Sequence, residues 1–423
     1  MNAQAPIRGA ELVAGGSRIG FGPQWLARVW AGRFDRIIDR IDAGLARGAL
    51  ELVLPDGRLR MLGGRAPGFE AQVRLASLRA VLRLVTSGSV GCYQGWEAGD
   101  WTSNDPVALF ALFVDNAIEL GDAARARGPW RVLARAAHRL RRNTRSGAER
   151  NVHAHYDLGN DFYAAWLDPA MIYSSARFGA RFGAQFGGAE DDLAGGQQRK
   201  LETIAGRLGA PATVLEIGCG WGAMARHLSD TGAAVTAISL SDAQLAWARE
   251  RHGAADIEFR KQDYRDVAGQ FDAIASVEMV EAVGRAYWPD FFDCIARCLK
   301  PGGRAAIQYI AIRDELFDAY AASADFIQSY VFPGGMLVRE SEFRQLAAAS
   351  GLTWCDQEGF AADYAKTLRL WRENFELAVE EGRLPPGFDA RFVRLWRFYL
   401  MYCEAGFRGG GIDVVQVTLV KQS

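Results

Sequence analysis

Several features that would place a protein in an oxidising compartment or a metal-binding class are scarce in this sequence. Only six cysteines occur among 423 residues, none of them in a C-x-x-C pair, and the N-terminus has no basic segment followed by an apolar one. This usage is typical of reduced thiols in a cytoplasmic protein without a zinc site. His153 and His155 lie close together, but no third ligand is near them, so we expect no bound metal.

Long apolar runs and an excess of one charge are also missing. The longest apolar run, from Val107 to Leu120, is interrupted by Asp115 and Asn116 and is too short to span a bilayer. The 49 basic and 50 acidic residues give a net charge of −1, which argues against nucleic-acid binding through overall charge. We therefore expect no nucleic-acid partner, and a protein that can touch a membrane surface but does not cross it.

The length favours two domains. In residues 1–125, apolar side chains recur at helical spacing from Gln24 to Arg47, and the segment from Glu51 to Arg60 alternates around a Pro-Asp-Gly turn. We predict a small α+β domain with a hairpin and an amphipathic helix, which packs on its own domain or lies on lipid. Two roles stay open for this domain: lipid presentation, or contact with a second copy in a homodimer.

A strongly basic stretch follows. From Trp130 to Arg150 arginine is frequent and Glu149 is the only acid. We interpret residues 126–150 as a linker, either simply solvated or attracted to anionic phospholipid headgroups. Residues 151–423 then form the second domain.

The second domain is organised around a glycine-rich turn. An apolar segment that includes Glu216 leads into glycines at alternate positions, and a helical pattern follows from Ala223. A dinucleotide fingerprint would read G-x-G-x-x-G with an acid about 20 residues further on, but here the spacing is G-x-G-x-G and the later position falls near Ser239. The turn therefore favours S-adenosylmethionine, with Glu216 placed to reach its ammonium group. The residues concerned are Glu216, Gly218, Cys219, Gly220, Trp221 and Gly222.

Strand and helix patterns alternate after this turn, which indicates a parallel sheet covered by helices. A Lys-Pro-Gly-Gly turn at 300–303 before the fifth strand is typical of methyltransferases, and Val414 to Val420 suits an added antiparallel strand. We predict an α/β fold: a class I methyltransferase, Rossmann-like sheet with a smaller N-terminal α+β domain. Ligands bind at the carboxyl ends of such strands. This places Ser239, Asp263, Glu278, Glu281 and Gln308 along one edge with the glycine turn.

Over residues 150–420 the chain resembles the cyclopropane-fatty-acyl-phospholipid synthase family, which includes the mycolic-acid cyclopropane synthases. The resemblance depends on many blocks in the same order: His155 to Tyr163, Leu167 to Pro169, Met171 to Ser174, Ile217 to Gly222, Gln262 to Asp266, Glu281 with Val283 and Gly284, Phe332 and Pro333, Asp363 and Tyr364 with Thr367 and Leu368, Cys403, and Phe407 with Arg408.

The resemblance implies contacts to S-adenosylmethionine beyond the glycine turn. Tyr173 and Ser174 are expected to contact the cofactor, Ser239 and Gln244 its ribose, and Asp263 with Tyr264 its adenine. These roles fit the side chains, because a hydroxyl or an amide can bond to ribose and a carboxylate can accept from an adenine amino group.

The resemblance also implies a catalytic bicarbonate, held in the family by a Cys backbone, a Glu, a His, an Ile backbone and a Tyr. Here Glu281, Ile310 and Tyr364 match, whereas the Cys position is Ser175 and the His position is Gln308. An amide can orient an anion but carries no proton at neutral pH. Ala282 replaces the usual His after the Glu, and Glu278 adds an acid that could share a proton or repel an anion.

In the family's chemistry an acyl double bond attacks the sulfonium methyl, and the resulting carbocation loses a proton. A dry pocket protects that cation, and the aromatic faces of Tyr156, Tyr173 and Tyr364 would stabilise it. Cys403 matches a position once assigned as a catalytic thiol in the family, but we favour the interpretation that it is a buried packing residue.

We therefore predict an S-adenosylmethionine-dependent methyltransferase that acts on an unsaturated phospholipid acyl chain, cytoplasmic and peripheral to the inner face of the membrane. The changes at Gln308 and Ala282 favour a methyl or methylene branch over a ring. The alternatives are a true cyclopropane synthase, a non-catalytic lipid-binding relative, and a nicotinamide oxidoreductase, which the glycine spacing disfavours.

Overall fold

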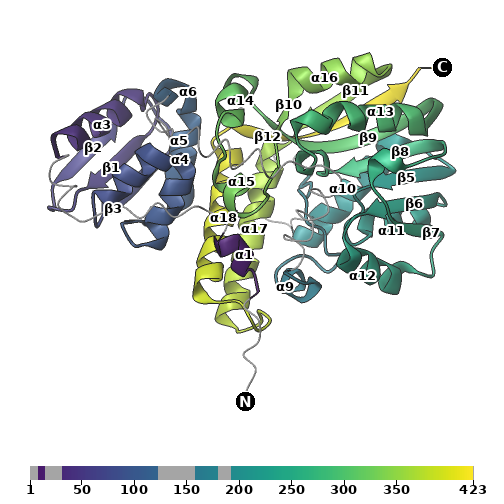
Figure 1. The fold of residues 1–423 in the computed structure, drawn as a ribbon, viewed down its shortest axis with the longest axis horizontal. Helices are drawn as coiled ribbons and strands as arrows, with labels where there is room; N and C mark the ends of the chain where they lie inside the picture. Colours follow the sequence, from purple (N-terminus) through teal and green to yellow (C-terminus); the bar gives the residue numbers. More distant parts are fainter. Residues whose placement is uncertain (1–7, 15–30, 122–157, 180–191, 423) are drawn as a thin grey trace.

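The computed structural model describes residues 8–14, 31–121, 158–179 and 192–422, and it contains two β-sheets (Figure 1). The smaller sheet belongs to the N-terminal part of the chain and the larger one to the C-terminal part. The predicted boundaries at residues 125 and 150 stay a prediction, because the basic stretch from Trp130 to Arg150 lies outside the described residues.

The N-terminal domain has four strands in the order β2-β1-β3-β4, with helices packed against them. β1 and β2 form the predicted antiparallel hairpin around the Pro-Asp-Gly turn. The described part of the predicted amphipathic helix is α3, which buries Phe34, Ile38 and Ile41 in its own domain. The elements are α3 (Ala31–Gly44), β1 (Ala49–Val53), β2 (Leu59–Gly63), β3 (Glu70–Leu75), α4 (Arg79–Glu97), β4 (Trp101–Ser103), α5 (Pro106–Asp115) and α6 (Ala117–Leu120).

The larger sheet confirms the predicted methyltransferase fold. Its strands follow the order β11-β12-β9-β8-β5-β6-β7, and β10 pairs with the end of β9. The strands from β9 to β7 are parallel, whereas β12 is antiparallel to both β9 and β11. The strands are β5 (Thr213–Ile217), β6 (Ala234–Ser239), β7 (Ile257–Lys261), β8 (Phe271–Val277), β9 (Leu299–Ile312), β10 (Val338–Arg339), β11 (Leu352–Gly359) and β12 (Ile412–Lys421).

Helices cover both faces of this sheet (Figure 1). The helices of this part of the chain are α9 (Asn160–Ala164), α10 (Leu193–Leu208), α11 (Ala223–Asp230), α12 (Asp242–His252), α13 (Trp288–Cys298), α14 (Asp314–Ala321), α15 (Phe326–Tyr330), α16 (Glu340–Ala349), α17 (Ala361–Glu380) and α18 (Ala390–Arg408), with short 3₁₀ turns at Tyr264–Asp266, Val280–Ala282 and Arg285–Tyr287.

One local prediction was wrong. The Lys-Pro-Gly-Gly segment does not precede the fifth strand but lies inside β9 as a bulge. Leu299 pairs with Phe271, and Arg304 pairs with Ala273. The residues of β9 between Leu299 and Arg304 therefore lie opposite the single residue of β8 between Phe271 and Ala273. A positive φ of 74° at Gly302 allows this bend.

The two domains share a hydrophobic core. In Figure 1, α17 and α18 stand between the N-terminal domain and the large sheet. Phe398 of α18 contacts Tyr93 of α4 and Phe110 of α5, with ring centroids 5.2 Å apart in both pairs. The first described helix, α1 (Ala10–Ala14), packs against α18, so this part of residues 1–125 lies on the C-terminal domain.

No helix among the described residues combines the length and the apolarity needed to cross a bilayer.

Candidate active site

The first cavity, of about 210 Å³, lies at the carboxyl ends of β5, β6 and β8, where the predicted cofactor residues gather. Of the twelve predicted cofactor contacts, only Gly222 does not line it. The lining contacts are Tyr173, Ser174, Glu216, Gly218, Cys219, Gly220, Trp221, Ser239, Gln244, Asp263 and Tyr264.

The glycine turn has the backbone that its sequence predicts. Gly218, Gly220 and Gly222 all have positive φ, of 85°, 52° and 87°, a conformation that residues with side chains rarely adopt. A Cβ on Gly218 would lie 2.6 Å from the side chain of Met279. Gly222 is the N-cap of α11, so it shapes the turn and does not face the cavity.

A buried acid, Glu216, and a buried base, Lys200, both line the first cavity. Burial raises the pKa of Glu216 to about 8, although a hydrogen bond from the Ala225 N–H and the charge of Lys200 act to lower it. Burial lowers the pKa of Lys200 to about 8, and its ammonium donates to Ser174 Oγ at 2.6 Å. Glu216 Oε2 is buried without a hydrogen-bond partner, which suits an incoming ammonium group. Sequence reasoning missed Lys200, which precedes the glycine turn on α10 without a motif.

The residues expected to contact ribose and adenine line the same cavity. Ser239 and Gln244 are buried, and Ser239 Oγ donates to Gln244 Oε1 at 3.3 Å. Asp263 also lines the cavity, but Arg265 donates to both of its oxygens, at 2.8 and 2.5 Å. The Tyr264 hydroxyl donates to the Tyr287 carbonyl at 3.3 Å. A hydrogen bond from the adenine amino group to Asp263 must therefore compete with the ion pair between Asp263 and Arg265.

A second, mostly apolar cavity of about 540 Å³ extends from the predicted catalytic residues into the N-terminal domain. This volume lies within the range of about 300–1,000 Å³ that is usual for ligand sites. Glu281, Ile310, Tyr364 and Cys403 line it near the first cavity. Its apolar wall comes from α3, β1, β2, β3, α4 and α5, and includes Ile38, Ile41, Leu50, Leu52, Leu62, Val73, Leu75, Val81 and Leu109.

Among the residues that the structure describes, three line both cavities: Tyr173, Glu278 and Ala282. The junction is rich in rings, because Tyr173 packs on Trp371 with centroids 5.2 Å apart and shares a hydrogen bond of 2.7 Å with the Tyr399 hydroxyl. A group transferred from one cavity to the other would pass this junction. Tyr156, the third predicted aromatic residue, lies outside the described residues.

Glu278 is held at the junction by predicted catalytic residues. Its Oε1 accepts from the Ser175 N–H at 2.9 Å and from the Gln308 amide at 2.7 Å, and its Oε2 accepts from the Tyr364 hydroxyl at 2.6 Å. Ser175 and Gln308 are buried behind it and line neither cavity. Burial raises the pKa of Glu278, whereas Tyr364, Ser175, the charge of Lys200 and Gln308 oppose this rise.

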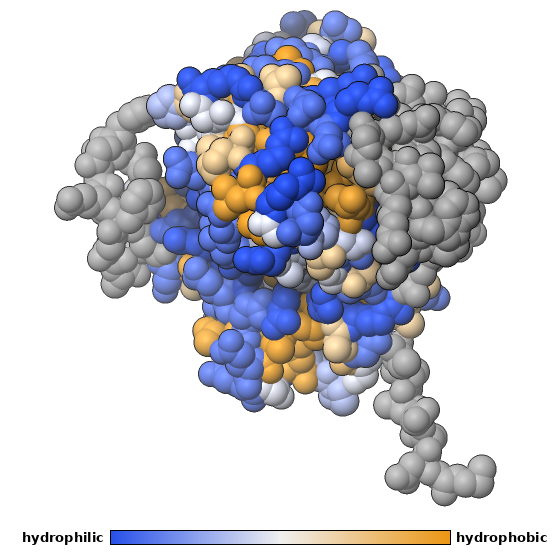
Figure 2. Space-filling view, turned by 90° about the vertical axis from the view of Figure 1, so that its left-hand side faces the viewer, coloured by the Kyte–Doolittle hydropathy of each residue, from blue (hydrophilic) through white to orange (hydrophobic). Residues whose placement is uncertain are grey.

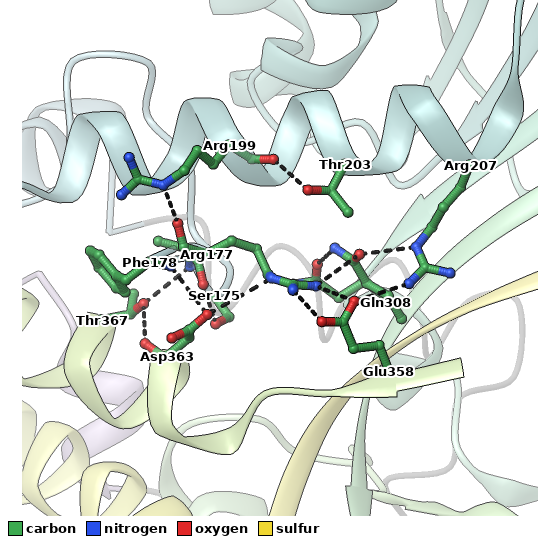
Figure 3. A network of polar contacts seen from close by, with 12 residues as sticks. Ser175, Arg177, Phe178, Arg199, Thr203, Arg207, Gln308, Glu358, Asp363 and Thr367 are labelled. Carbon is green, nitrogen blue, oxygen red and sulfur yellow. Dashed lines mark hydrogen bonds and ion pairs between the residues drawn. The ribbon is translucent and has the colours of Figure 1, made fainter. Parts of the chain in front are cut away.

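The orientation of the Gln308 amide is fixed by a chain of donors. Arg207 and Arg177 donate to Gln416 Oε1 at 3.2 and 3.4 Å, and Gln416 in turn donates to Gln308 Oε1 at 2.9 Å. Guanidinium groups can only donate, so the Gln308 N–H groups face Glu278. Figure 3 shows Arg177 and Arg207 converging from separate segments on Glu358 and on the side of Gln308.

Glu281 is the second buried carboxyl group beside the junction. One of its oxygens accepts from the Ile310 N–H, and the other is buried without a hydrogen-bond partner. Burial, followed by the charge of Glu278, raises the pKa of Glu281 to about 8. At neutral pH, Glu281 therefore holds a proton while Glu278 is surrounded by donors.

Cys403 lines the second cavity, but its environment does not suit a nucleophile. Burial raises the pKa of its thiol, with a smaller contribution from the charge of Asp325. Because the thiolate is the nucleophilic form, the structure favours the packing interpretation of Cys403.

Known proteins resemble the chain over most of its length. The family model described as mycolic acid cyclopropane synthetase matches residues 143–417. The tuberculostearic acid methyltransferase UfaA1 of Mycobacterium tuberculosis is 36% identical over 80% of this chain and 81% of its own length. The cyclopropane-fatty-acyl-phospholipid synthase of Escherichia coli K12 is 31% identical over 84% of this chain and 88% of its own length.

Solved structures agree with this likeness. The cyclopropane synthase MmaA2 of Mycobacterium tuberculosis is 28% identical, with a TM-score of 0.59 over 64% of this chain and 98% of that chain. The mycolic acid cyclopropane synthase CmaA1, solved with SAH and CTAB, is 27% identical, with a TM-score of 0.57 and the same coverage. Together with the strand order and the two joined cavities, these matches show that the chain belongs to the mycolic acid cyclopropane synthetase family of S-adenosylmethionine-dependent methyltransferases.

Proposed function

We propose that this lipid-modifying methyltransferase transfers a methyl carbon from S-adenosylmethionine to the double bond of an unsaturated phospholipid acyl chain and leaves a methyl or methylene branch. One observation carries the proposal: the first cavity, which contains the buried Glu216 and Lys200, and the mostly apolar second cavity meet at Tyr173, Glu278 and Ala282. A relative named as a tuberculostearic acid methyltransferase supports the branched outcome.

The first cavity fits the methyl donor. Glu216 Oε2, which has no hydrogen-bond partner among the described residues, accepts from the ammonium group of the methionine part of the cofactor. The ammonium of Lys200 faces the carboxylate of that methionine part. Ser239 and Gln244 present a hydroxyl and an amide for ribose. When bound, S-adenosylmethionine supplies an electrophilic methyl group on a positively charged sulfur.

The second cavity fits the acyl chain. Apolar walls exclude water, and the olefin lies at the end where the tyrosines gather. The π electrons of the double bond form the new carbon–carbon bond as the sulfur–methyl bond breaks, and the sulfur keeps that electron pair. The faces of Tyr173 and Tyr364 stabilise the cation left on the chain. A hydride shift that moves the charge to the carbon bearing the new methyl group, followed by loss of a methyl proton, gives a methylene branch. Loss of a methyl proton without that shift closes a ring, and a saturated methyl branch requires a separate reductase.

Product analysis tests the proposal. Purified protein is incubated with methyl-labelled S-adenosylmethionine and vesicles of a mono-unsaturated phospholipid, and the lipids are analysed by mass spectrometry. Because a methylene branch and a ring have the same mass, proton NMR distinguishes vinylidene from cyclopropane hydrogens. We expect vinylidene signals. Ring signals would identify a cyclopropane synthase, and the absence of labelled lipid would refute the lipid substrate.

We also propose contact with the cytoplasmic face of the membrane. Figure 2 looks onto the N-terminal domain, where hydrophobic side chains lie at the surface among hydrophilic ones. Leu59 and Met61, on the edge strand β2, are 56% and 61% exposed and flank Arg60. Vesicle co-sedimentation should weaken when both become glutamate, but not in the control Leu377→Glu, whose side chain is 48% exposed on α17. Equal binding of both variants would contradict this contact. The homodimer stays a prediction.

A further inference from the structure

The family resemblance implies a bicarbonate base, but the residues of this chain do not fit one. The expected binding groups are Ser175 N–H, Glu281, Gln308, Ile310 N–H and Tyr364. Three of them already donate to Glu278, at 2.9, 2.7 and 2.6 Å, and Ile310 N–H donates to Glu281. No donor of the set is left for a free anion, and any anion placed there would lie beside two carboxyl groups.

We propose that the carboxylate of Glu278 replaces bicarbonate as the general base of this enzyme. This inference rests on the proposed function, and it assigns the group that accepts the proton. Glu278 occupies the hydrogen-bond positions that would otherwise hold the anion, and it is attached to the chain at the junction of the two cavities.

The surroundings of Glu278 keep it ready to accept a proton. Ser175 N–H and the Gln308 amide can only donate to it, and the order Arg207, Gln416, Gln308 prevents the amide from turning its oxygen toward the carboxylate. Oε2 accepts from the Tyr364 hydroxyl, and a carboxylate oxygen has a second lone pair that can take the proton of the substrate.

Glu278 is also better placed than Glu281 for this role. Glu281 lines only the second cavity, whereas Glu278 reaches the junction where the new methyl carbon forms. After a hydride shift has moved the positive charge to the chain carbon that bears the new methyl group, a methyl C–H bond breaks and its electron pair becomes the second bond of the methylene C=C. The proton passes to Glu278 Oε2, so atoms and charges balance without an added anion.

The backbone at Glu278 suggests the most informative variant. Its φ of 48° is unusual for a residue with a side chain, so Glu278→Gly relieves the backbone while it removes the base and opens space among the donors. Glu278→Gln keeps the volume but cannot accept the proton. Asp356→Gly is the control, because Asp356 is an exposed acid on β11 with a similar φ of 51°, and the substitution keeps the backbone carbonyl that accepts from Arg207.

The assay measures label transfer to mono-unsaturated phospholipid vesicles in buffer freed of carbon dioxide and in the same buffer with bicarbonate. We expect the wild type and Asp356→Gly to be equally active in both. Glu278→Gln should lose at least about 100-fold in both, the usual effect of losing a general base, and should still bind S-adenosylmethionine in a thermal-shift assay. Glu278→Gly should recover at least about tenfold with bicarbonate, within the range expected of a general base.

A second readout does not depend on turnover. Carbon-13-labelled bicarbonate should show saturable line broadening with Glu278→Gly and none with the wild type. Wild-type activity that falls when bicarbonate is removed, or Glu278→Gln activity close to that of the wild type, would overturn the inference while leaving the proposed function intact. A wild type that labels no lipid in either buffer would instead count against the proposed function.

Discussion

Replacing Glu281 with glutamine should make the protein more stable, and the gain should be larger at neutral than at acidic pH. Burial and the charge of Glu278 raise the pKa of Glu281 from 4.5 to about 8. Between these two pH values Glu281 has lost its proton in the unfolded state but still holds it in the folded state. The free energy of unfolding of the wild type therefore falls as the pH rises through this interval. At pH 7 the interval from the unfolded pKa is about two and a half pH units, which corresponds to about 3 kcal/mol.

Glutamine stays neutral at every pH and keeps an acceptor for the Ile310 N–H. The free energy of unfolding of Glu281→Gln should therefore exceed that of the wild type by less than about 1 kcal/mol at pH 5 and by about 3 kcal/mol at pH 7. Urea denaturation at both pH values measures this difference. Glu250→Gln, on the exposed side of α12, is the matched control and should change little. A difference that is the same at pH 5 and pH 7, or a less stable variant, would refute the reasoning.

Three further predictions concern the two cavities. Glu216→Gln should weaken S-adenosylmethionine binding at least about tenfold, as expected for loss of a buried charged partner. Because burial raises the pKa of Glu216 to about 8, the affinity of the wild type should increase from pH 6 to pH 8, whereas that of the variant should not. Isothermal titration calorimetry measures both effects, and the same pH profile for both proteins would contradict the pairing of Glu216 with the ammonium group. Val73→Phe, which fills the N-terminal end of the second cavity, should shift the products toward shorter acyl chains without changing S-adenosylmethionine affinity, as measured by lipid mass spectrometry; an unchanged distribution of chain lengths would place the acyl chain elsewhere. Cys403→Ala should lower the turnover number less than about threefold, since burial keeps the thiol neutral, and a loss of about 100-fold would restore a catalytic thiol.

The order of the large sheet and most of the first cavity could be predicted because their signals are local in sequence. Strands β5, β6 and β8 carry apolar residues between helical patterns, and the alternate glycines permit the positive φ values of the turn. Gly222 and Asp263 were harder to predict, because an N-cap role and an ion pair with Arg265 depend on the three-dimensional surroundings of each residue.

The anchoring of Glu278 could not be predicted from spacing. Its partners Ser175, Gln308 and Tyr364 come from a loop, a strand and a helix that only the folded sheet brings together. The sequence did indicate that an extra acid lay beside Glu281. It could not indicate whether that acid would repel an anion or accept the anion's hydrogen bonds, because the answer depends on the direction of three donors.

The position of β12 has a consequence for biosynthesis. This last strand lies between β9 and β11 rather than at the edge, and it carries Gln416, which orients Gln308. A chain that lacks Ile412–Lys421 would leave a gap in the middle of the sheet, with β9 and β11 exposed to other polypeptides. The large sheet can therefore close only once this segment has been synthesised, and a variant truncated before it would be an aggregation-prone protein rather than a slower catalyst.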